Sequence, residues 1–169
     1  MKPLLFLTLG IAGALLAQDK SNPMSAETKG IYTQAKTNIL KSAEKMTEEN
    51  YGFKPSADVR NYGAVLGHIV DSQYFFCAAA KGEKKDSSAE KEITSKAGLI
   101  EALKASFAYC DSAYDSLTDA QGATMMKFGR GQRSVAGILN FNNAHDFEHY
   151  GNLVTYLRIK GLVPPSSEK

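Results

Sequence analysis

The sequence predicts an all-α protein, a four-helix bundle. Four segments repeat apolar residues at the 3.6-residue spacing of an amphipathic helix. Capping residues, or Gly and Pro, separate these segments from one another. No stretch of useful length alternates apolar and polar residues as a half-buried strand would. A chain of 169 residues suits one domain and is long enough to bury a core.

The first two predicted helices are bounded by capping and breaking residues. The first begins with Ser25 as its N-cap and ends before Tyr51-Gly52-Phe53-Lys54-Pro55. Its apolar positions are Ile31, Ala35, Ile39, Ala43 and Met46. The second begins at Asp58 or Asn61 and continues to about Ala80. On one side, which we expect to face the core, it carries Ala64, Val65, His68, Ser72, Phe75 and Ala79.

A charged connection over residues 81–88 precedes the third predicted helix, which begins at Thr94 or Ser95. Its predicted buried side consists of Leu99, Leu103, Phe107, Cys110, Tyr114 and Leu117. Residues 119–133 are predicted to be mostly irregular because glycines recur there.

The fourth predicted helix has Ser134 as its N-cap and runs to about Lys160. One side of it carries Ile138, Asn142, His145, His149, Leu153 and Tyr156. Gly161 is a suitable residue for the position after the helix, and Pro164-Pro165 prevents its continuation.

Basic and acidic residues nearly balance in this chain. The 20 Lys and Arg residues and 18 Asp and Glu residues give a formal net charge of +2. They form neither a polybasic run nor a basic face interleaved with aromatic residues, so we expect no nucleic-acid partner. Nothing in the charge pattern indicates binding to a membrane surface.

Residues 1–17 have the organisation of a secretory signal peptide. Lys2 provides a short positive region, and an apolar run from Leu4 to Leu16 follows. Ala17 then provides a small residue of the kind found at a signal-peptide cleavage site. The apolar run is shorter than the ~20 residues of a membrane span. The sequence therefore predicts an exported protein, periplasmic or extracellular, whose mature domain covers residues 18–169 and has no membrane association after cleavage. An uncleaved anchor or a buried helix is the alternative.

The chain has three histidines, and two of them are four residues apart. On a helix this spacing places His145 and His149 on one face, with Cβ atoms ~5–6 Å apart. Both rings can then reach one ion at roughly 2.0–2.1 Å per Zn–N bond. His68 also lies in an apolar, helix-like segment, so we predict that all three meet at one metal ion. The alternative is that they are hydrogen-bonded polar groups of the core.

Two blocks of the sequence match a known family. One runs from Tyr51-Gly52-Phe53-Lys54-Pro55 to Gly67-His68-Ile69, and the other runs from Ala144-His145-Asp146-Phe147-Glu148-His149-Tyr150-Gly151-Asn152 to Pro165. Through them the chain resembles the DinB-like (damage-inducible) family. The resemblance implies an up-down-down-up four-helix bundle, a homodimer, and a divalent metal held by His68, His145 and His149. Imidazole suits several metals, and we expect Zn or Ni.

The topology that the resemblance implies also bears on the two cysteines. If the second and third helices run parallel, Cys77 and Cys110 lie at nearly the same height and can be bridged if they face each other. In an antiparallel hairpin they would be too far apart. An oxidising compartment favours pairing. A disulfide and two buried free thiols both remain open.

Two classes of function fit a three-histidine site. Three neutral imidazoles leave an open coordination position, as in catalytic zinc sites. Since the resembling family includes thiol-dependent transferases and isomerases, the first class is a metal-dependent transferase or hydrolase with a small-molecule substrate. The second class is a non-catalytic metal-binding or stress-related structural protein. The candidates to orient a ring or accept a proton, none with an assigned catalytic role, are Asp71, Asn142, Asp146 and Glu148.

Overall fold

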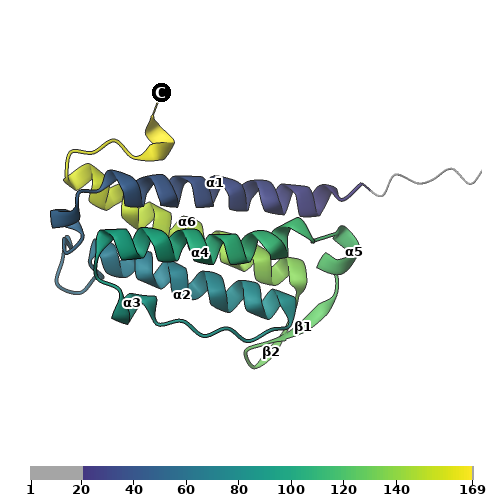
Figure 1. Ribbon diagram of the computed structural model, residues 1–169. Helices are drawn as coiled ribbons and strands as arrows, with labels where there is room; N and C mark the ends of the chain where they lie inside the picture. Colours follow the sequence, from purple (N-terminus) through teal and green to yellow (C-terminus); the bar gives the residue numbers. More distant parts are fainter. Residues whose placement is uncertain (1–20, 169) are drawn as a thin grey trace, which may run out of the picture.

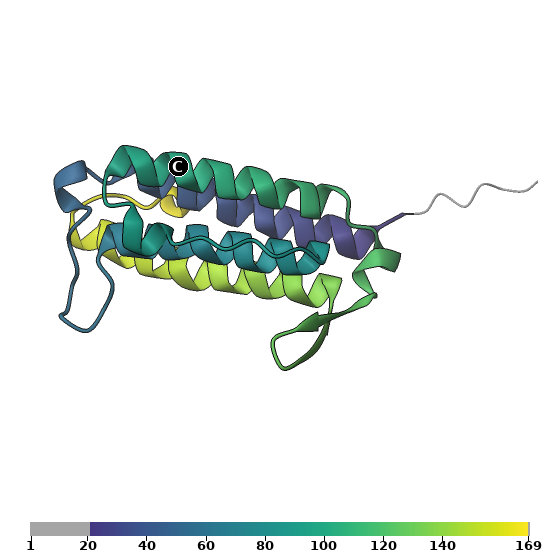
Figure 2. The same ribbon diagram turned by 60° about the horizontal axis from the view of Figure 1, so that its bottom comes forward.

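The computed structural model describes residues 21–168, so the predicted signal peptide lies outside the described part of the chain. Four long helices lie side by side along one axis, as Figures 1 and 2 show from two directions. They are α1 (Pro23–Lys45), α2 (Tyr62–Lys81), α4 (Lys96–Asp115) and α6 (Val135–Ile159). The predicted all-α four-helix bundle is confirmed. None of the helices in residues 21–168 combines the length and apolarity that a bilayer span requires.

Short elements connect the long helices. They are η1 (Glu48–Asn50), α3 (Ala89–Glu92), α5 (Asp119–Gly122), β1 (Met125–Phe128), β2 (Gly131–Ser134) and η2 (Pro165–Ser167). The strands pair antiparallel, and Gly129 in the turn between them has a φ of 58°. The prediction that residues 119–133 are irregular is therefore wrong. Helix α5 is one turn and each strand has four residues, too short for a periodic pattern to reveal.

Side-chain caps fix the starts of three long helices. The side chains of Asn61, Ser95 and Ser134 accept hydrogen bonds from backbone N–H groups in the first turns of α2, α4 and α6. The prediction that Ser25 caps the first helix is wrong, because α1 begins at Pro23. Instead, the backbone N–H and hydroxyl of Ser25 both donate to Oδ1 of Asp119, at 2.8 Å each. Asp119 at the start of α5 thus caps α1 from a distant part of the chain.

Helices α2 and α4 run in the same direction. Near their starts, a Cβ on Gly63 would lie 3.3 Å from a side-chain atom of Leu99. Near their ends, Cys77 and Cys110 form a disulfide with a Cα–Cα distance of 5.3 Å. The connection between them must therefore return along the bundle, and it passes beside α2 and includes α3 (Figures 1 and 2). This return path places α3 against the first half of α2.

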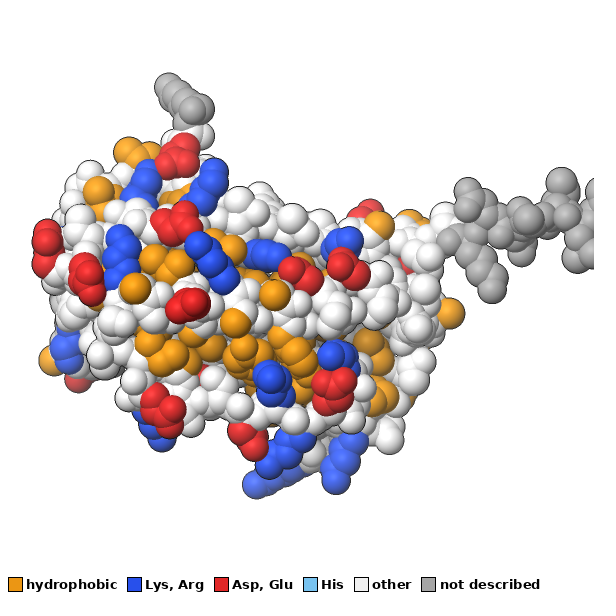
Figure 3. All heavy atoms as spheres, in the orientation of Figure 1, with side chains coloured by type: hydrophobic (Ala, Val, Ile, Leu, Met, Phe, Trp, Pro, Cys, Tyr) orange, Lys and Arg blue, Asp and Glu red, His pale blue; other side chains and the backbone are white. Residues whose placement is uncertain are grey.

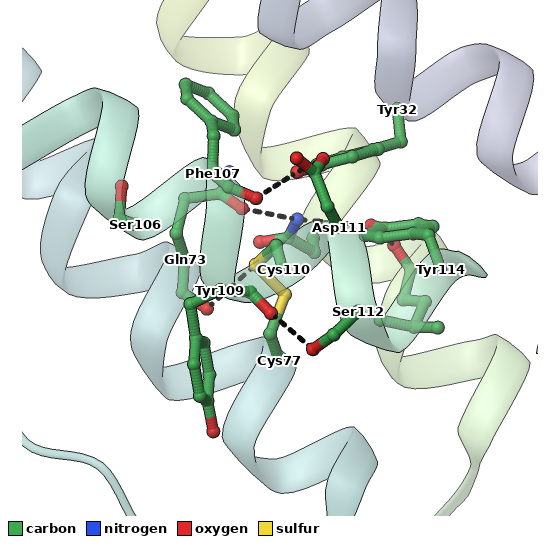
Figure 4. The surroundings of a disulfide bond; sticks show 12 residues. Tyr32, Gln73, Cys77, Ser106, Phe107, Tyr109, Cys110, Asp111, Ser112 and Tyr114 are labelled. Carbon is green, nitrogen blue, oxygen red and sulfur yellow. Dashed lines mark hydrogen bonds between the residues drawn. A yellow bond between two sulfur atoms is a disulfide. The ribbon is translucent and has the colours of Figure 1, made fainter. Parts of the chain in front are cut away.

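The disulfide lies in the core, where both cysteines are fully buried. Figure 4 shows Gln73 beside the bridge, and the Gln73 carbonyl oxygen lies 3.2 Å from Sγ of Cys110. Of the two states that the sequence left open for Cys77 and Cys110, the structure has the bridge.

Ion pairs join α1 to α4 on the surface. They connect Lys29 with Asp115, Lys36 with Asp111, and Glu44 with Lys104. On the face in Figure 3, basic and acidic side chains are interspersed with apolar ones. Exposed pairs of this kind contribute at most about 1 kcal/mol each, so the core and the bridge contribute most to the stability of this bundle.

Candidate metal centre

Three histidine rings converge between α2 and α6. The Nε2 atom of His145 lies 3.2 Å from Nε2 of His68 and 3.0 Å from Nε2 of His149. One nitrogen from each ring lies within 4.8 Å of the other two. Ring nitrogens bound to a tetrahedral zinc ion at 2.0–2.1 Å would be about 3.3 Å apart. The spacing of these atoms therefore fits a shared divalent ion.

Local structure brings the rings together. His145 and His149 are four residues apart on α6 and so occupy one face of that helix. His68 comes from α2, which packs along α6. The ring of Phe76 packs against His145 with a centroid distance of 5.6 Å. Two separate segments thus contribute ligand atoms to one place.

The environment keeps the two imidazoles of α6 neutral. Burial, followed by the neighbouring rings of His149 and His68, lowers the pKa of His145 to about 4. Burial and the ring of His68 lower the pKa of His149 to about 4 as well. A neutral imidazole has the free lone pair that a metal ion requires. Both rings are therefore ready to bind an ion at neutral pH without first losing a proton.

The second nitrogen of each ring has a different environment. Nδ1 of His68 lies 3.0 Å from a carboxylate oxygen of Glu90, and Nδ1 of His149 lies 3.3 Å from the side-chain amide nitrogen of Asn152. Nδ1 of His145 is buried and makes no hydrogen bond to the described residues. An imidazole that binds metal through Nε2 carries its proton on Nδ1, and for His68 the carboxylate of Glu90 can accept that proton.

The four polar residues proposed from the sequence make no hydrogen bond to a ring nitrogen. Asp71 accepts the backbone N–H of Ala89 at the start of α3, and Glu148 is exposed. Asn142 and Asp146 are buried in the core. Burial raises the pKa of Asp146 to about 8, although the amide of Gln73, which donates to both of its oxygens, lowers it. Sequence reasoning missed Glu90, which lies 22 residues from His68 on a different element.

A cavity of about 420 Å³ opens beside the rings. It is lined by His68, Asp71, Ser72, Phe75, Phe76, Lys85, Asp86, Ser87 and His145. The hydroxyl of Ser72 lies 3.5 Å from Nε2 of His145, and Phe75 is 54% exposed. The prediction that Phe75 faces the core is therefore wrong, whereas Ser72 is buried and the side chain of His68 is 25% exposed. Helix α2 is apolar around most of its circumference, which makes its buried side difficult to identify from periodicity.

No other titratable side chain completes the group. Among the His, Cys, Asp and Glu residues of the described chain, only the three histidines come close enough together to hold an ion. The arrangement thus has three protein ligand atoms, and two of the three rings border the cavity. Three ligands with one open position are typical of catalytic zinc sites, whereas structural zinc sites usually have four protein ligands.

Comparisons with known proteins agree with this fold. A DinB-like protein from Bacillus cereus ATCC 10987 has a TM-score of 0.69 and 20% identity, over 83% of this chain and 95% of that chain. The DinB-like protein YjoA from Bacillus subtilis has a TM-score of 0.64 and 20% identity, over 80% and 92%. A mycothiol-dependent maleylpyruvate isomerase has a TM-score of 0.62 and 14% identity, over 76% and 60%.

No curated protein matches the sequence. The sequence profile of the DinB superfamily matches residues 31–153, which include all three histidines and most of the four-helix bundle. The chain therefore belongs to the DinB superfamily.

Proposed function

We propose that His68, His145 and His149 bind one divalent metal ion, Zn or Ni, and that the chain is an exported metal-dependent transferase or hydrolase with a small-molecule substrate. The observation that carries this proposal is the convergence of three imidazoles on one point beside a cavity, with no fourth protein ligand among the described residues. A bound ion would supply Lewis-acid activation of a nucleophile or of a polarised group on the substrate.

The residues around the ion would bind and orient that substrate. Phe75 and Phe76 form an apolar wall of the cavity, and the hydroxyl of Ser72 lies beside the ring of His145. An apolar wall with a few placed polar groups is the usual composition of a small-molecule site. The related isomerase is mycothiol-dependent by name, so a low-molecular-weight thiol is the first co-substrate to test here.

Two observations support export. Residues 1–17 have the pattern of a signal peptide. The bond between Cys77 and Cys110 also suits an oxidising compartment, because disulfides are rare in the cytosol.

The second candidate is a non-catalytic metal-binding protein. The histidines would let an ion connect α2 to α6, just as the disulfide connects α2 to α4. In that case the ion would stabilise the bundle and no substrate would exchange at the open position.

Metal analysis of the purified mature chain tests the proposal. We expect one ion per chain in the wild type and a sharp loss in His149→Ala, with helical content by circular dichroism nearly unchanged. Unchanged metal content in that variant would contradict the site.

Cobalt substitution then distinguishes the two functions. A spectrum that changes when a small thiol is added indicates an open position and favours an enzyme, whereas an unresponsive spectrum favours the structural alternative.

A further inference from the structure

Helix α3 is a single turn that lies against α2, next to His68. One side chain of α2 caps it: Oδ1 of Asp71 accepts the hydroxyl of Ser87 at 2.6 Å and the backbone N–H of Ala89 at 2.7 Å. Oδ2 of Asp71 accepts the backbone N–H of Glu90 at 3.2 Å. Both oxygens of one carboxylate therefore determine where this turn sits.

Gly67 allows the close approach of α3 to α2. A Cβ atom at this position would lie 2.6 Å from Cα of Glu90 and 2.8 Å from its backbone nitrogen. Backbone atoms cannot move aside as the end of a flexible side chain can. A side chain at residue 67 would therefore push the turn, and Glu90 with it, away from α2.

The carboxylate of Glu90 is held between two side chains. Arg60 Nε donates to Oε1 at 2.8 Å, and Oε2 lies 3.0 Å from Nδ1 of His68. A carboxylate only accepts hydrogen bonds, so this contact requires the proton of a neutral His68 ring to be on Nδ1. Nε2 of His68 then keeps its lone pair, and this nitrogen is the one that lies 3.2 Å from His145.

We propose that Asp71, helix α3 and Glu90 form a positioning device, which we name the α3 clamp, that fixes the tautomer and orientation of His68 for metal binding. Glu90 is a positioning residue, because it contacts the ligand ring and lies on the opposite side of that ring from the ion position. The inference rests on the proposed metal site. Acceptors of this kind typically contribute 10–100-fold to metal affinity.

Metal affinity and ring tautomer together test the α3 clamp. We expect Glu90→Ala to weaken Co(II) or Zn(II) binding by 10–100-fold and to lower the Nδ1–H population of His68 in long-range ¹H–¹⁵N spectra of the metal-free chain at pH 8. Glu90→Gln should recover most of the tautomer population, because the amide oxygen can also accept the proton. Gly67→Ala should weaken metal binding as well, although it removes no charge.

The exposed Glu92, on the same turn, provides the matched control. Glu92→Ala should change neither the affinity nor the tautomer. Wild-type affinity together with a wild-type tautomer in Glu90→Ala would overturn the proposal. If the wild-type chain binds no ion, the proposed function fails, but the tautomer in the metal-free chain still tests the clamp. Circular dichroism identifies any variant that has lost the bundle, and the Gln variant then serves in its place.

Discussion

The two sides of α2 make different connections. Toward α4, Cys77 is fully buried and covalently bonded to Cys110. Toward α6, the side chain of His68 is 25% exposed and borders a cavity. One contact is permanent and excludes solvent, whereas the other is open on one side. The bridge therefore stabilises the packing of α2 on α4, whereas the side of α2 that faces α6 leaves a histidine ring accessible from the cavity.

One residue contacts both regions. The carbonyl of Gln73 lies beside the sulfur of Cys110, and its side-chain amide donates to Asp146, the neighbour of His145 in sequence. If the bridge only supports the bundle, its loss should affect stability and leave the histidines unaffected. If the bridge also positions the site, metal affinity should fall with stability. Variants can separate these two cases.

Loss of the bridge should have the largest effect on stability. The cysteines are separated by 33 residues, and the chain-entropy relation gives about 3–4 kcal/mol for a loop of that length. We therefore expect Cys77→Ala/Cys110→Ala to lower the free energy of unfolding by that amount in urea titrations, with metal affinity within about twofold of wild type. Reducing the wild-type chain provides the control without a substitution. An equally large loss of metal affinity would show that the bridge positions the site.

Removal of the ion should have the next largest effect. A ligand that binds only the folded chain stabilises it by about 2.7 kcal/mol at a free concentration of 100 times its Kd. We expect a chelator to lower the melting temperature of the wild type and to leave that of His149→Ala unchanged. A melting temperature that does not move in either protein would mean that no ion contributes to stability.

The sequence predicted the elements of this molecule that a periodic pattern of residues marks. The four long helices follow from 3.6-residue periodicity, and the caps Asn61, Ser95 and Ser134 follow from residue type next to a periodic run. The convergence of the histidines could be predicted in part from the spacing of His145 and His149, which is a local property of one helix. His68 was included because it lies in an apolar, helix-like segment, and the resemblance supported that choice, since no spacing rule relates separate helices.

Other features depend on how distant segments approach one another. Glu90 contacts His68 only because the connection between α2 and α4 returns along the bundle, a path that no local pattern encodes. Phe75 was assigned to the core because α2 is apolar on nearly every side. The residue pattern therefore could not distinguish the exposed face of α2 from its buried faces. The cysteine pairing likewise depended on the relative direction of two helices, and the residues alone left that direction open.

The smallest predicted effect lies at the start of α1, away from both the disulfide and the histidines. The backbone N–H and hydroxyl of Ser25, and the backbone N–H of Met24, donate to Asp119 and hold its pKa below the ordinary value. A lowered folded-state pKa means that the stabilisation is complete above the unfolded-state pKa of about 3.9 and is lost as pH falls through the folded-state pKa.

We therefore expect Asp119→Ala to lower the melting temperature by a few degrees at pH 7, and this difference from wild type should shrink below about pH 4. Melting curves from pH 7 to pH 3 measure it. Asp115→Ala is the matched control, because it removes only an exposed pair with Lys29 and should change less. Metal affinity should be unchanged in both variants, since these carboxylates bond to residues of α1 and not to the histidines. Protonation of the wild-type carboxylate should weaken its stabilising bonds and so bring the melting temperature of the wild type closer to that of Asp119→Ala. If the two melting temperatures instead moved further apart toward low pH, the assigned role of Asp119 would be contradicted.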